Sequence, residues 1–244
     1  MLTQGGLSEL SSEQQDMFTR KQELKEEIVE LESSIQKASQ MIMSTELVSM
    51  KRVMRRLEMA DRNDVPTMKG KVACSISACD EILVTEMIFS GMLQDLDAQQ
   101  IAAVLSCLIY TDSKENQEGV NRISKHEKLG APFIALQKHA DTVATIMIES
   151  KIPLDKEEYV AKFKPDMMEL TMLWCSGASF KEVCDEARDI FEGTIIRAFR
   201  RLDELISQLV EAAKIIGNKE LRGKLEETQK SLKRGIVFTA SLYL

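Results

Sequence analysis

The side chains best suited to chemistry are three arginines and one glutamate near residue 200. If a helix begins near Glu192, its turn of about 100° per residue gathers four side chains on one side: Arg197, Arg200, Arg201 and Glu204. Guanidinium groups bond phosphates and stack on bases, and the carboxylate would limit how tightly a strand is held. Periodicity alone favours a solvated face with Arg and Glu pairs four residues apart, so both interpretations stay open.

A second basic group raises the same two interpretations. Its members are Lys51, Arg52, Arg55 and Arg56. The whole chain is acidic, with a formal net charge of −7 and a pI near 5.2, and aromatic residues make up only 5% of it. The charge argues against a general nucleic-acid coat protein, and the low aromatic content argues against a base-stacking sheet. Any nucleic-acid contact should therefore be local.

Known catalytic motifs do not occur in the sequence. A P-loop needs a glycine five residues before its Gly-Lys pair and a Ser or Thr after it, but Gly70-Lys71 has Val65 upstream and Val72 downstream. Nucleophile-elbow, HExxH and dinucleotide-binding patterns are also missing. Acidic pairs such as Asp80 with its neighbour are expected to be helix caps or solvated residues. We assign no catalytic residue and expect no ATP hydrolysis by this chain alone.

Cysteine and histidine usage predicts no metal site. The five cysteines form no C-x-x-C pair, and neither His126 nor His139 lies near a cysteine at ligand spacing or has an obvious serine partner. Most of the cysteines have apolar neighbours, so we expect buried thiols at Cys74, Cys79, Cys107, Cys175 and Cys184. The longest apolar runs fall far short of the roughly 20 residues that span a bilayer, and the N-terminus lacks a secretory signal. We expect an intracellular protein with no membrane passage.

The elements that must position these side chains are mostly helices. From Met17 onward, apolar residues recur at alternating intervals of four and three, the pattern of a coiled-coil seam: Leu24, Ile28, Leu31, Ile35, Ala38 and Ile42. Such a narrow stripe needs a partner helix outside this chain, another protomer, or the domain that follows. We expect residues 1–45 to be one arm of something larger.

Residues 61–77 interrupt the helical pattern. A break is expected around Pro66, after which the apolar residues Val72, Cys74 and Ile76 alternate with small or polar ones. This alternation predicts a short β-strand or hairpin edge. One strand cannot form a sheet, so the segment indicates a domain begun upstream.

The rest of the chain predicts successive helices packed as a bundle. Cap residues stand three positions before a Gln or Glu at Asp97, Asp155 and Ser179, and Gly177 and Gly217 fall at expected helix ends. The predicted fold class is therefore all-α, a helical bundle preceded by a long coiled-coil helix and a short β or winged-helix remnant.

Three further segments carry expectations. Residues 111–119 are polar and acidic and predict a mobile loop. The apolar C-terminus is expected to dock into the bundle, because a frayed end would expose Phe238, Leu242 and Leu244. Residues 179–209 outline a helix-turn-helix, which keeps a DNA-binding regulator as an alternative, although the domain is less basic than such proteins usually are.

Eight short segments, in order, resemble one family. They are Lys69-Gly-Lys-Val-Ala-Cys, Asp80-Glu-Ile-Leu-Val-Thr-Glu, Leu105-Ser-Cys, Phe163-Lys-Pro-Asp, Trp174-Cys-Ser-Gly-Ala-Ser-Phe, Phe191-Glu-Gly-Thr-Ile-Ile-Arg, Arg201-Leu-Asp-Glu and Ser241-Leu-Tyr-Leu. Together they resemble the C-terminal region of the exosome-associated DExH-box RNA helicases, and they look closer to the nuclear TRAMP-complex member than to the cytoplasmic Ski-complex relative. The family usually has Gly at Cys79 and an acidic residue at Ser75.

The resemblance implies an organisation and a site. Residues 1–45 resemble the returning arm of a coiled-coil arch, residues 46–78 the remnant of a winged-helix domain, and residues 79–244 the C-terminal helical bundle, or DSHCT domain. In this family a ratchet helix in the bundle contacts RNA leaving two RecA-like motor domains. The helix that begins with Phe191-Glu-Gly resembles it, so its arginine and glutamate stripe becomes the expected RNA contact.

The resemblance also implies a function. The parent protein is expected to use ATP and Mg to unwind RNA and feed it 3′ to 5′ into the exosome, with TRAMP-type adaptors as partners, in the nucleus, or in the cytoplasm if it is of the Ski type. This chain itself is expected to hold no cofactor and no metal. The alternatives are a helix-turn-helix DNA-binding regulator and a non-enzymatic coiled-coil interaction scaffold.

Overall fold

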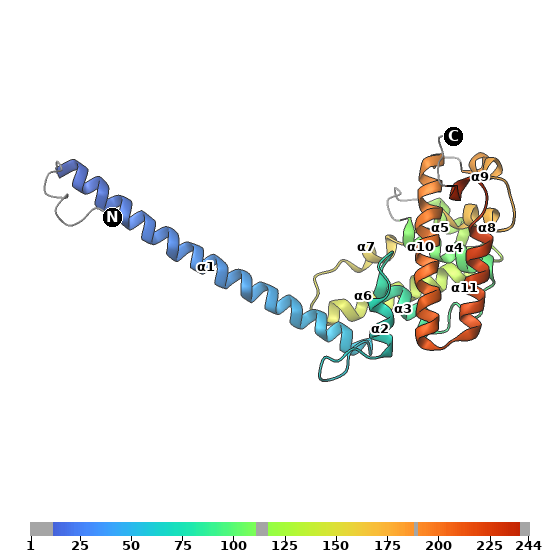
Figure 1. The fold of residues 1–244 in the computed structure, drawn as a ribbon, viewed down its shortest axis with the longest axis horizontal. Helices are drawn as coiled ribbons and strands as arrows, with labels where there is room; N and C mark the ends of the chain where they lie inside the picture. The colour runs from blue at the N-terminus through green and yellow to red at the C-terminus, as the bar shows by residue number, and fades with distance from the viewer. Residues whose placement is uncertain (1–11, 111–116, 188–189, 240–244) are drawn as a thin grey trace. The chain divides into compact units, whose positions relative to one another are not determined.

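The structure is a computed structural model, and it describes residues 12–110, 117–187 and 190–239. In these residues the helices are α1 Ser12–Arg56, α2 Met68–Cys74, α3 Glu81–Phe89, α4 Ala98–Ile109, α5 Gln117–Ser124, α6 Gly130–Glu149, α7 Lys156–Ala161, α8 Met168–Cys175, α9 Phe180–Glu186, α10 Glu192–Ile216 and α11 Lys219–Leu232, followed by the 3-10 turn η1 Ile236–Phe238 (Figure 1). The same residues contain no strand, only one antiparallel bridge between Ala60 and Pro66. The all-α prediction is confirmed.

The chain divides after Ser49 into two compact units. In the first unit the predicted seam is helical but uncovered, since Leu24, Ile28, Leu31 and Ile35 are 43%, 53%, 56% and 68% exposed. The side chain of Ile42 and residues 1–11 lie outside the described residues. The described seam therefore has no partner within its own unit, as a narrow apolar stripe predicts.

The predicted strand at residues 71–77 is wrong, because these residues are mainly the helix α2 and its C-terminal end. A strand would bury Cys74 and expose Ala73, but the structure exposes Cys74 and buries Ala73 together with Val72. Thr67 caps the start of this helix, and its hydroxyl accepts from the Gly70 amide at 3.2 Å. Gly70 lies so close to residue 59 that an added Cβ would stand 2.0 Å from the Met59 carbonyl oxygen. Tertiary packing of the buried face of α2 therefore determines that these residues are helical.

The second unit is a bundle built around α4, which is buried from Ile101 through Ile109. Helix α4 packs against α8, α10 and α11, and α10 lies beside α11 (Figure 1). Trp174 of α8 joins these layers, since its ring stacks on Phe199 of α10 at 5.6 Å and its indole nitrogen donates to the Leu232 carbonyl at 2.8 Å. The core thus fixes α10 along its apolar side.

The predicted helix ends are confirmed. Asp97 and Ser179 each form a capping box, and Asp155 accepts from the Glu158 amide. Gly217 ends α10 in the left-handed conformation with φ of 77°.

Two predicted segments fall partly outside the described residues. Residues 111–116 of the expected loop lie outside them, and α5 begins at Gln117, so the end of that loop is helical. At the C-terminus, Val237 is fully buried and Phe238 packs on the core, as expected of a docked end, whereas Leu242 and Leu244 lie outside the described residues.

Candidate nucleic-acid interface

Helix α10 carries the predicted interface, and its apolar side is completely covered. Its buried residues include Ile195, Phe199, Leu202, Ile206 and Leu209. The four predicted site residues, Arg197, Arg200, Arg201 and Glu204, are all exposed. The helix therefore presents a polar face while its opposite side is held by the bundle, which is the geometry that the 3.6-residue period predicts.

The three arginines differ in what they contact. Arg197 donates to the Thr194 hydroxyl one turn earlier, at 3.1 Å. The Nε atom of Arg200 donates to the Val237 carbonyl at 2.8 Å, and its Nη2 atom donates to the Thr239 carbonyl at 3.2 Å. This difference could not be predicted from the sequence, because residues 200 and 237 are far apart in the chain.

Arg201 lies on the side of α10 that faces the α2–α3 connection. Seven residues later on the same helix side, the Gln208 oxygen accepts from the amides of Ser77 and Ala78 at 2.8 and 3.1 Å, and its nitrogen donates to the Ser77 hydroxyl at 3.2 Å. Burial raises the pKa of the neighbouring Cys79 thiol to about 12; Asp80 and Glu81 add to the rise, and Lys162 and Arg201 oppose it. The two cations therefore lie within electrostatic reach of this connection.

The acidic pair at the start of α3 has a structural role. One Asp80 oxygen accepts from the Leu83 amide at 2.9 Å and caps α3, and the other accepts from the Tyr159 hydroxyl at 2.8 Å. Burial, with Asp80 close by, raises the pKa of Tyr159 above its ordinary value. Asp80 is the helix cap that the sequence predicted.

Phe191 is a candidate residue that sequence reasoning missed. It precedes the first turn of α10 and is 84% exposed. Exposed aromatic rings can stack on the unstacked bases of a single strand. The signal available in the sequence was a large aromatic residue followed by Glu-Gly at an expected helix start.

The second basic group is largely occupied by ion pairs. Lys51 and Arg55 both contact Asp64, at 3.1 and 2.6 Å, and Arg56 pairs with Glu149. Hydrogen bonds from the two cations hold the pKa of Asp64 below its ordinary value. These contacts favour the solvated-face interpretation for this group over phosphate binding.

The thiols and histidines do not form a reactive centre in the described residues. Cys107 and Cys175 are buried as predicted. Cys79 and Cys184 are only partly buried and Cys74 is exposed, so the prediction of five buried thiols is wrong at Cys74 and is met only in part at the other two. His139 lies 3.2 Å from the Ser90 hydroxyl, a partner that the sequence did not reveal, and this hydroxyl also donates to the Met87 carbonyl at 3.0 Å.

The described ranges contain neither a candidate metal site nor a helix suited to span a membrane. Residues 12–110, 117–187 and 190–239 contain no group of three or more His, Cys, Asp or Glu side chains placed to hold a metal ion. In the same part of the chain, no helix has the length and apolar character needed to cross a bilayer.

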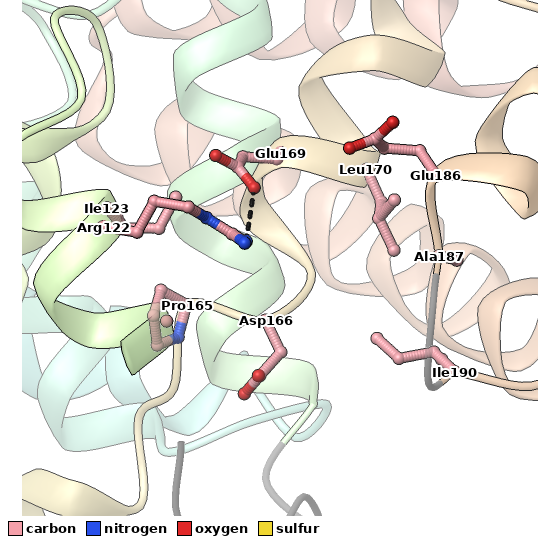
Figure 2. Close-up of a pocket in the computed structure, with 10 residues that line it drawn as sticks. Arg122, Ile123, Pro165, Asp166, Glu169, Leu170, Glu186, Ala187 and Ile190 are labelled. Carbon is pink, nitrogen blue, oxygen red and sulfur yellow. Dashed lines mark hydrogen bonds and ion pairs between the residues drawn. The ribbon is translucent and has the colours of Figure 1, made fainter. Parts of the chain in front are cut away.

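A small pocket lies between α5 and α8, close to the start of α10. Figure 2 shows Arg122 beside Glu169 and Ile190 on the other side of the pocket. The Nη2 atom of Arg122 donates to Oε2 of Glu169 at 2.6 Å. Its volume of about 120 Å³ is well below the roughly 300 Å³ of ordinary ligand sites. Its arginine is already paired with a carboxylate, so the pocket does not suit a nucleotide.

The helical bundle and its arginine-bearing helix are those of a known domain class. Residues 63–239 match the DSHCT (NUC185) domain, and the chain belongs to that family.

Its relatives are larger proteins. The chain is 46% identical over 227 residues to the ATP-dependent RNA helicase mtr4 of Schizosaccharomyces pombe, covering 93% of this chain and 20% of that protein. It is 42% identical over 225 residues to the exosome RNA helicase MTR4 of Homo sapiens, covering 92% and 21%. The antiviral helicase SKI2 of Saccharomyces cerevisiae is 31% identical over 197 residues, covering 79% and 15%. The chain thus spans about a fifth of the length of the first two relatives.

Proposed function

We propose that this chain is the RNA-guiding C-terminal module of an ATP-dependent 3′ to 5′ RNA helicase that feeds RNA to the exosome. The observation that carries the proposal is α10, whose apolar stripe from Ile195 to Leu209 is buried while Arg197 and Arg201 are exposed. Two relatives are named as an exosome RNA helicase and an ATP-dependent RNA helicase, and these names support the helicase activity proposed for the longer protein. Neither the DNA-binding alternative nor the scaffold alternative has comparable support.

Four exposed residues at or near the start of α10 have separate tasks in this proposal. Arg197 and Arg201 bind phosphates of a passing strand, and Glu204 limits the strength of that contact so that the strand can move. Phe191 offers its exposed ring to a base at the start of the helix.

ATP and Mg belong to the longer protein in this proposal, because Gly70-Lys71 does not fit a phosphate and the described residues contain no group placed to hold a metal ion. Gly70-Lys71 lies inside α2, and Gly70 is packed against the Met59 carbonyl, so no loop of free amides surrounds a phosphate there. The RecA-like motor domains of the longer protein would hold the nucleotide. The exosome and TRAMP-type adaptors are the proposed partners, and the nucleus is the proposed location, or the cytoplasm for a Ski-type protein.

The proposed organisation keeps three parts: an arch arm at 1–45, a winged-helix remnant at 46–78 and the bundle at 79–244. An apolar hollow of about 390 Å³, lined by Met54, Met59 and Ile82 among others, supports the middle assignment. Such a hollow is suited to apolar side chains of a neighbouring domain rather than to phosphate.

Binding to single-stranded RNA tests the proposal directly. Arg201→Glu in the 244-residue chain should weaken binding of a fluorescent oligoribonucleotide by about tenfold or more at low salt, because a cation on the phosphate path becomes an anion. Arg62→Glu is the matched control, since Arg62 is also exposed but lies in the α1–α2 connection. If the two variants lose RNA affinity equally, the effect comes from net charge alone and the proposal is wrong.

Two measurements extend the test. In the longer helicase, Arg201→Glu should lower RNA-stimulated unwinding more than it lowers the melting temperature, because Arg201 lies off the core. The chain alone should show no ATPase activity, and a measured turnover would contradict the assignment of the motor to other domains.

A further inference from the structure

Arg200 differs from its neighbours because the C-terminal segment occupies its guanidinium. Two of its N–H groups donate to the carbonyls of Val237 and Thr239, at 2.8 and 3.2 Å. Hydrogen bonds from a charged donor are about twice as strong as neutral ones, and this planar fork holds two points of the segment at once. Val237 is fully buried, so its carbonyl is fixed where Arg200 meets it.

We propose that Arg200 is a positioning residue that fastens residues 235–239 to α10 and makes no contact with RNA. The first part stands on the hydrogen bonds alone. The second part rests on the proposed function and narrows the RNA-facing set to Arg197, Arg201 and Glu204.

A second anchor holds the same segment from the buried side of α10. Arg234 stacks over the Trp174 ring at 3.8 Å and donates to the carbonyls of Trp174 and Ala178. Gly235 follows with φ of 64°, a conformation that turns the chain beside Trp174 and that favours glycine. Trp174 stacks on Phe199, the residue before Arg200. The Arg234 anchor is therefore connected, through Trp174, to the same turn of α10 that carries the Arg200 anchor.

These contacts define the two edges of the exposed face of α10. Consecutive helical residues lie about 100° apart around the axis, so Arg200 and Arg201 point to different edges. The C-terminal segment lies at the Arg200 edge, and the α2–α3 connection, bound by Gln208, lies at the Arg201 edge. A strand that follows the helix therefore meets Arg197 and Arg201, while Arg200 sets the position of one edge.

Amide hydrogen exchange in the 244-residue chain tests the anchor. Arg200→Ala and Arg200→Lys should both speed exchange in the peptide that covers residues 235–239 by about tenfold or more, because lysine keeps the charge but not the fork. Arg201→Ala and Arg201→Lys are the matched controls and should leave that exchange unchanged. Unchanged exchange in both Arg200 variants would overturn the anchor.

The salt dependence of RNA binding tests the second part. Removing one phosphate contact to a single strand flattens the slope of log K against log salt by about 0.7, which is expected for Arg201→Ala. Arg200→Ala should leave the slope unchanged, and a flattening equal to that of Arg201→Ala would overturn the claim that Arg200 makes no RNA contact. If no variant and no wild-type chain binds RNA, the proposed function fails, whereas the exchange result still decides whether Arg200 is the anchor.

Discussion

The helix at residues 12–49 and the bundle at residues 50–239 have similar apolar patterns, but they differ in whether the apolar residues are buried. Both show apolar residues at intervals of three and four, but the seam at Leu24, Ile28 and Leu31 is exposed, whereas the matching stripe on α10 is buried. Periodicity reports which side of a helix is apolar, and only the presence of neighbouring elements determines whether that side is covered. Stability should therefore depend strongly on the bundle and weakly on the first unit.

The largest expected effect is Trp174→Ala, which removes the ring that joins α8, α10 and α11. It should lower the free energy of unfolding by about 3–5 kcal/mol, whereas Leu31→Ala in the first unit should change it by less than about 0.5 kcal/mol. Urea titration followed by far-UV circular dichroism measures both, since Trp174 is the single tryptophan and fluorescence would be lost with it. If Leu31→Ala lowers the free energy of unfolding as much as Trp174→Ala does, the claim that stability depends weakly on the first unit is wrong.

Gly70→Ala comes next, because the new methyl group would overlap the Met59 carbonyl. We expect a loss of about 1–3 kcal/mol. Gly223→Ala is the matched control: Gly223 is an exposed glycine inside α11 with open space around it, and the change should stabilise the chain by about 0.5–1 kcal/mol. If both substitutions stabilise, the close packing between α2 and residue 59 is not real.

The capping box of α4 should contribute less than the core. Asp97→Ala removes the acceptor for the Gln100 amide, now at 2.8 Å, and should cost about 1 kcal/mol in chemical denaturation. Asp97→Asn keeps an acceptor oxygen and should recover most of that loss. No difference between alanine and asparagine would show that the cap contributes nothing to the central helix.

The smallest effect concerns Asp64, whose pKa is lowered by Lys51 and Arg55. A carboxyl with a lowered folded pKa stabilises the fold above its unfolded pKa of about 3.9, and that contribution is lost as the pH falls through the folded value. The melting temperature of Asp64→Asn should therefore lie slightly below wild type at pH 7, and the gap should close toward pH 3. If the difference in melting temperature between wild type and Asp64→Asn increases as the pH falls, the charged form of Asp64 destabilises the fold.

Local chemistry made much of the fold predictable from the sequence. Asp97, Asp155 and Ser179 were recognised as caps because a side-chain acceptor three residues before Gln or Glu acts within one turn. The exposed face of α10 followed from the helical period alone. Both inferences depend only on residues that are close together in the chain.

Long-range contacts could not be predicted in this way. The alternation at Val72, Cys74 and Ile76 favoured a strand, but packing on Met59 selected a helix. Arg200 had the same periodicity as Arg197 and Arg201, and only the return of residues 237–239 to α10 separates it from them. The RNA contact itself remains a prediction for the described arginines.

Gln208 has a consequence for how α10 would respond to solution conditions. Its amide binds Ser77 and Ala78 through uncharged hydrogen bonds alone. Ionic screening weakens charge pairs but hardly affects such neutral contacts. The rotation of α10 about its own axis should thus stay constant from dilute buffer to concentrated brine, even under conditions in which its arginines no longer attract polyanions.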